Sequence, residues 1–71
     1  MAEQVLAELV GNVLRVEVVI GDVVTAADVL VILESMKMEI PVHSEHGGTV
    51  TSVAVSAGDV VSEGDLLVEL S

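Results

Sequence analysis

Apolar and polar residues alternate along two similar stretches of this 71-residue chain. The segments "VLRVEV" (13–18) and "VTSVAV" (50–55) place aliphatic side chains at alternating or near-alternating positions. This is the period of a β-strand with one buried face. Two aliphatic runs, "VLVIL" (29–33) and "LLVEL" (66–70), predict further short strands. The chain therefore reads as β-structure on both sides of its midpoint.

The segments between these strands read mostly as turns. The dipeptide "GD" occurs at 21–22 and again at 58–59, and "EHGG" (45–48) predicts a loop. The first ten residues, "MAEQVLAELV" (1–10), could start a helix by propensity, but the strand-rich remainder favours an initial strand. We expect the first and last strands to pair, which would hide sheet edges.

The two halves of the chain repeat one pattern. Residues 11–34 and 48–71 align at an offset of 37, with 12 of 24 positions identical. Two copies are too few for a solenoid, so a closed domain with two similar halves is the better interpretation. We expect a single domain over residues 1–71, folded as a small all-β sandwich or flattened barrel.

Composition supports this fold and narrows the function. Apolar residues make up 52% of the chain, aromatic residues 0%, and there are 17 valines, a bias that favours strands. The net charge is -10, with Arg15 and Lys37 as the only basic residues, so nucleic acids and anionic membrane surfaces are poor partners. The chain has no cysteine, no apolar run of membrane-spanning length and no basic N-terminal region. We expect a soluble cytoplasmic protein that is a monomer when unbound.

The unique lysine stands in the stretch "ESMKMEI" (34–40). If Met36 and Lys37 are the two central residues of a tight hairpin, the flanking residues face each other in three pairs. These pairs are Ser35 with Met38, Glu34 with Glu39, and Leu33 with Ile40. The period-2 rule then puts Leu33, Ser35, Met38 and Ile40 on an inward face and both glutamates on the outward face. Pro41 cannot donate a ladder hydrogen bond, so this strand is expected to lie near a sheet edge or to end there.

Two features of this hairpin oppose stability. A two-residue turn prefers Asn-Gly or Asp-Gly because both residues need positive φ, and Met36 and Lys37 adopt that geometry at a cost of about 1 kcal/mol or more each. Glu34 opposite Glu39 is a like-charge pair across the strands, which is also unfavourable. These costs indicate selection for an exposed amine at a protruding tip.

The motif "ESMKMEIP", the paired "GDVV" segments and the "GGTV" opening of the second half resemble the biotinyl/lipoyl carrier domain family. The resemblance covers nearly the whole chain and is strongest to small stand-alone biotin carriers. It implies a flattened barrel of two four-stranded antiparallel sheets related by pseudo-two-fold symmetry. The modified lysine would lie at one end and both termini at the other. Ser35 departs from the alanine that is frequent in the family, and the additional "thumb" insertion of some members is absent.

The resemblance also implies roles for individual residues. Lys37 would carry covalent biotin, added by a biotin protein ligase, with Met36 and Met38 as its flanks. Carboxybiotin would then travel between biotin carboxylase and carboxyltransferase subunits, and the carrier itself would catalyse nothing. Glu34 and Glu39 are candidate ligase-recognition residues, or else ordinary solubilising charges. Met38 is expected to pack inward.

Other readings of the same residues remain open. A lipoyl carrier would use the same lysine, although lipoyl sites usually show Asp-Lys-Ala at the tip. An unmodified interaction module that competes for a ligase or carboxylase surface is a second alternative. His43 and His46 form H-x-x-H in a loop, but they lack enough further ligands for a metal site, so we interpret them as solvated histidines.

Overall fold

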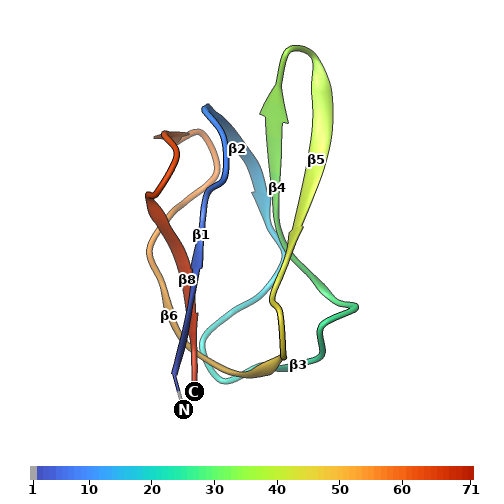
Figure 1. Cartoon of the computed structure of the whole chain (residues 1–71), viewed down its shortest axis with the longest axis vertical. Helices are drawn as coiled ribbons and strands as arrows, with labels where there is room; N and C mark the ends of the chain where they lie inside the picture. Colours follow the sequence, from blue (N-terminus) through green and yellow to red (C-terminus); the bar gives the residue numbers. More distant parts are fainter. Residues whose placement is uncertain (1) are drawn as a thin grey trace.

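Eight β-strands form the part of the chain that the computed structural model describes, residues 2–71 (Figure 1). They are β1 (Glu3–Leu6), β2 (Gly11–Val16), β3 (Val23–Val24), β4 (Val29–Ser35), β5 (Met38–His43), β6 (Gly48–Val53), β7 (Val60–Val61) and β8 (Leu66–Leu70). One sheet has the strand order β1-β8-β6-β3 and the other β5-β4-β2-β7, with antiparallel pairing throughout. The predicted all-β fold of two four-stranded antiparallel sheets is therefore confirmed.

The predicted strands are all present, but 13–18 and 50–55 are displaced by two residues in β2 and β6, and Gly48 of the predicted loop begins β6. The run 66–70 coincides with β8, the run 29–33 extends by two residues in β4, and the first strand is β1 rather than a helix. The two-residue strands β3 and β7 were not predicted as separate elements, because two residues are too few to show an alternating pattern.

The repeat in the sequence is a pseudo-two-fold symmetry in the structure. A shift of 37 residues places β6, β7 and β8 where β2, β3 and β4 stand, and it relates β5 to β1, so each strand order becomes the other. The registers agree as well: the pair Glu3↔Leu70 corresponds to the pair Ile40↔Leu33. The β4–β5 connection thus corresponds to the gap between the chain ends. The hairpin tip accordingly lies at the opposite end of the molecule from both termini (Figure 1).

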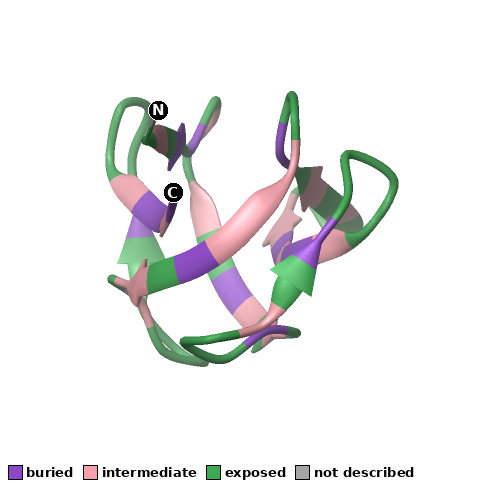
Figure 2. Cartoon of the chain, turned by 90° about the horizontal axis from the view of Figure 1, so that it is seen from below, coloured by how far each residue is buried: buried purple, intermediate pink, exposed green. Residues whose placement is uncertain are grey.

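The space between the sheets is filled by aliphatic side chains from both halves. The buried set is Val5, Ala7, Val13, Val18, Val24, Leu30, Val31, Leu33, Val50, Val61, Leu67, Val68 and Leu70. Figure 2 shows buried positions on strands of both sheets, whereas the connecting loops are largely exposed. Each fully buried leucine or valine contributes about 1.5–3 kcal/mol relative to an exposed one, so this core holds the two sheets together.

Aspartates at the turns account for part of the acidic composition. Each of four carboxylates accepts a hydrogen bond from the backbone N–H three residues earlier. The pairs are Asp22 with Val19 (3.0 Å), and Asp28 with Thr25, Asp59 with Ser56 and Asp65 with Ser62 (2.8 Å each). Asp22 corresponds to Asp59 and Asp28 to Asp65 under the 37-residue shift, so both halves close their turns in the same way.

Each sheet keeps open edges. β1 pairs with β8 as predicted, but this pairing does not remove the edge, because β1 has no strand on its other side. β5 is the edge strand of the second sheet, which confirms the position inferred from Pro41. Residues 2–71 contain no helix long and apolar enough to cross a membrane.

Candidate functional site

The turn between β4 and β5 has the backbone that was predicted for it. Met36 has a φ of 54° and Lys37 a φ of 64°, and they are the non-glycine residues with positive φ in the described chain, residues 2–71. Two successive positive φ values are those of a type I′ turn, a common two-residue hairpin connection. Side chains other than glycine, asparagine or aspartate adopt them at a cost of about 1–3 kcal/mol each.

The register on both sides of the turn is also as predicted. Ser35 faces Met38, Glu34 faces Glu39, and Leu33 faces Ile40. Glu34 is half-buried and Glu39 is exposed, so two like charges stand opposite each other next to the lysine. Such a pair destabilises the hairpin slightly but concentrates negative charge close to the amine.

The tip protrudes from the core (Figure 1). Lys37 is exposed, and the exposed fractions of Met36 and Met38 are 88% and 60%. The prediction that Met38 packs inward is therefore wrong. Leu33, 1% exposed, is the last buried residue of β4, and residues 36–39 beyond it are all exposed.

Within residues 2–71, no hydrogen bond or ion pair occupies the amine of Lys37. The ion pairs there join Arg15 to Glu17 at 2.9 Å and His46 to Glu45 at 3.8 Å. The amine is therefore open to an incoming reagent, and within residues 2–71 no basic group is hydrogen-bonded to it or paired with it as a general base would be. Such a site can be acylated by another protein, but it cannot activate itself.

The two histidines make unrelated contacts. His43 is the last residue of β5, and its Nδ1 atom lies 3.0 Å from the carbonyl oxygen of Asp28. This contact holds the end of β5 close to the residue that precedes β4. His46 lies beside Glu45 and is exposed. Within residues 2–71, no group of three or more histidine, aspartate or glutamate side chains could hold a metal ion.

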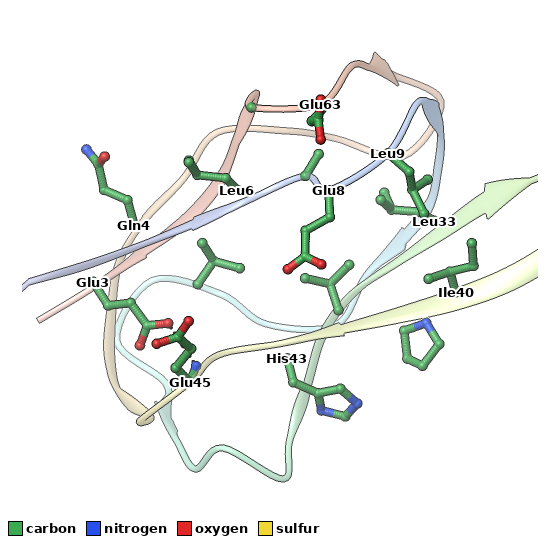
Figure 3. Close-up of a pocket in the computed structure, with 15 residues that line it drawn as sticks. Glu3, Gln4, Leu6, Glu8, Leu9, Leu33, Ile40, His43, Glu45 and Glu63 are labelled. Carbon is green, nitrogen blue, oxygen red and sulfur yellow. Dashed lines mark hydrogen bonds between the residues drawn. The ribbon is translucent and has the colours of Figure 1, made fainter.

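A groove of about 520 Å³ between β1 and β5 was missed by the sequence reasoning (Figure 3). It is lined by residues 3–9, 40–43 and 63–64, together with Leu33 and Glu45. The sequence contains one hint that links the two sides of this groove. The 37-residue offset also matches Val5 with Val42 and Glu8 with Glu45, which lie outside the aligned halves. That match relates the two walls of the groove to each other.

Comparison with known proteins identifies the family. The model of the biotin–lipoyl family, described as "Biotin-requiring enzyme", matches residues 2–70. The chain is 64% identical over 42 residues to the "Biotinylated protein TB7.3 homolog" of Mycobacterium leprae and 62% identical over 42 residues to "Biotinylated protein TB7.3" of Mycobacterium tuberculosis. Each of these matches spans 59% of this chain and 59% of the relative.

Two solved structures contain a segment with the same fold. The urea carboxylase of Kluyveromyces lactis superposes on the whole of this chain with a TM-score of 0.93 and 32% identity, over 6% of its own length. A single-chain, multi-domain long-chain acyl-CoA carboxylase superposes on 96% of this chain with a TM-score of 0.89 and 32% identity, over 7% of its length. The fold thus recurs as a small part of much larger carboxylases.

Proposed function

The chain belongs to the biotin–lipoyl family of biotin-requiring enzymes, and on that premise we propose that it is a biotin carrier modified on Lys37. The observation that carries the proposal is the unpaired, exposed lysine held at positive φ at the end of the molecule farthest from the termini. The names of the mycobacterial relatives, which describe biotinylated proteins, support biotin over lipoate.

The chain's own part in the modification is to present one nucleophile. Lys37 Nζ, as the neutral amine, would attack the acyl carbon of a biotinyl-adenylate held by a biotin protein ligase. An amide bond forms, the bond between the acyl carbon and the phosphate oxygen breaks, and AMP leaves. The amine's proton passes to a base of the ligase, because residues 2–71 place none beside Nζ. Met36 and Met38, which flank Lys37 in the sequence, are themselves exposed.

We assign Glu34 and Glu39 to ligase recognition. They face each other in the second residue pair from the turn, after Ser35 and Met38. They therefore place negative charge close to the hairpin tip. A complementary basic surface on the ligase would orient the tip, and this electrostatic guidance acts mainly on the rate of association.

Once attached, biotin supplies a ureido nitrogen that accepts and releases CO2. The chain would carry this group between a biotin carboxylase and a carboxyltransferase, and the likeness to segments of a urea carboxylase and an acyl-CoA carboxylase supports such a system. The lysine stem provides reach, and the rigid hairpin provides a fixed base for it. The chain's contribution is effective concentration at two sites rather than catalysis.

The deciding experiment is an intact mass measurement of the protein from its native host, with fragmentation to locate the added group. A biotinyl amide on Lys37, lost in a Lys37→Arg variant that folds normally, is the expected result. A lipoyl group on Lys37, an unmodified chain despite available ligase and biotin, or biotin on another atom would each overturn the proposal.

A further inference from the structure

The groove between β1 and β5 is walled by two open sheet edges. β1 pairs only with β8, and β5 pairs only with β4, so one side of each strand carries no partner. Pro41 removes an N–H donor from β5, whereas β1 contains no proline and keeps donors and acceptors on the side that does not face β8. An unpaired edge of this kind is a template for an added extended segment.

The two ends of the groove have different linings. Near the termini, the Glu3 carboxylate accepts hydrogen bonds from the backbone N–H groups of Glu45 (2.8 Å) and His46 (3.4 Å), which ties β1 to the loop after β5. Toward the hairpin, Leu9, Leu33 and Ile40 provide an apolar lining (Figure 3). The site therefore suits a narrow chain that carries some aliphatic side chains.

The titratable groups that line the groove are four carboxylates and the imidazole of His43. Glu3, Glu8, Glu45 and Glu63 are among its lining residues, and neither Arg15 nor Lys37 is. Figure 3 shows the Glu8 carboxylate in the space between β1 and β5. Within residues 2–71, no hydrogen bond occupies the carboxylates of Glu8 and Glu63, so both are available to a ligand. Glu3 differs, because its carboxylate already serves the loop.

These features select one class of occupant. Phosphate-bearing ligands and anionic lipids are repelled by the four carboxylates, and a second copy of a chain with a net charge of -10 is repelled as well. The carboxylates do not gather into a group that could hold a metal ion within residues 2–71. An extended segment with lysine or arginine at alternating positions meets all three features. Its backbone can pair with the open strand edge, its basic groups can pair with the carboxylates, and its aliphatic groups can contact the apolar lining.

We propose that the β1–β5 groove binds an extended basic segment of a partner protein. Alternate side chains of the segment place their ammonium or guanidinium groups beside Glu8 and Glu63, and the intervening aliphatic groups lie on Leu9 and Ile40. The site is separate from Lys37, so binding does not require the lysine to be modified. It extends the proposed carrier function with a docking surface on the body of the domain.

The test is an NMR titration of the 15N-labelled full chain with an acetylated, amidated peptide of alternating lysine and valine. The control peptide has glutamine in place of each lysine. We expect shifts concentrated in residues 3–9 and 40–45 with the lysine peptide and much weaker binding of the glutamine peptide. Equal binding of the two peptides, shifts centred on residues 34–39, or no binding at low salt would overturn the proposal.

Matched double variants separate groove recognition from general attraction to an acidic chain. Glu8→Gln with Glu63→Gln removes two charges at the groove, and Glu17→Gln with Glu39→Gln removes two exposed charges elsewhere, of which Glu17 is the ion-pair partner of Arg15. We expect the first pair to weaken peptide binding about fivefold, since exposed ion pairs each contribute little to affinity, and the second pair to change it less than twofold. Equal weakening by both variants would contradict a specific site. All four substitutions lie at exposed positions, and a denaturation curve of each variant verifies its fold.

Discussion

Gly11 of β2 lies directly against the backbone carbonyl of Glu34 in β4. A Cβ atom on Gly11 would stand 2.7 Å from the Glu34 oxygen, closer than the two atoms can approach without a shift of the backbone. The second half repeats the relationship between Gly48 and the carbonyl oxygen of Ser71. The glycines at the start of β2 and β6 therefore allow neighbouring strands to approach closely in both halves. In the first half this close approach holds β2 against β4 at Glu34, just before the turn that carries Lys37.

This packing predicts a difference between two glycines that both have positive φ. Gly48 has a φ of +145° and is crowded by Ser71, whereas Gly58 has a φ of +97° and no neighbour within 4 Å of a built Cβ. Both alanine variants bear backbone strain, but only Gly48→Ala adds a clash, so we expect it to be less stable than Gly58→Ala by about 1–3 kcal/mol. Urea denaturation measures both. Equal stability losses would show that strand separation at Gly48 is easily relaxed.

The turn geometry predicts a stabilising change at the site itself. Replacing Met36 and Lys37 together by Asn and Gly provides residues that adopt positive φ readily, so we expect unfolding to cost about 1–2 kcal/mol more and modification to be lost. Thermal denaturation and intact mass measure the two effects. Lys37→Arg is the control, since it should abolish modification and leave stability nearly unchanged. A clear loss of stability in the Asn-Gly variant would contradict the inference that the native turn is strained.

The facing glutamates predict separable effects on stability and on recognition. Glu34→Lys converts a like-charge pair into an opposite-charge pair, so stability should change by less than about 1 kcal/mol, in the favourable direction. Biotinylation by the ligase should be slower, because the negative site beside the amine is lost. Glu39→Lys makes the same change of charge on the facing strand and is compared with Glu34→Lys in both measurements. Unchanged ligase kinetics in the Glu34 variant would reduce that residue to a surface charge.

Much of the site could be predicted from local sequence rules. The two-residue turn at Met36 and Lys37 and the pairing of Glu34 with Glu39 follow from the period of a strand and from one choice of turn. The edge position of β5 follows from the missing donor of Pro41. These features depend on residues within a few positions of each other, so no knowledge of distant segments was needed.

The exposure of Met38 could not be predicted in the same way. Alternation correctly places it on the face shared with Leu33, but burial requires a second surface opposite that face. The other sheet ends before it reaches Met38, and the length of a facing sheet is not written in the pattern of one strand. A methionine that alternation assigns to the core is therefore 60% exposed beside the lysine.

The sequence by itself determined the strands, the repeat that relates the two sheets and the position of the lysine at a hairpin tip, because each is written in short-range alternation or in a fixed offset of 37 residues. Only the tertiary structure decided what lies between the sheets' edges. The hydrogen bond that the backbone N–H of Glu45 donates to the Glu3 carboxylate joins residues 42 positions apart. It exists because packing of the whole core brings β1 and β5 to facing edges. The groove and its row of carboxylates are consequences of that packing, which no local rule contains.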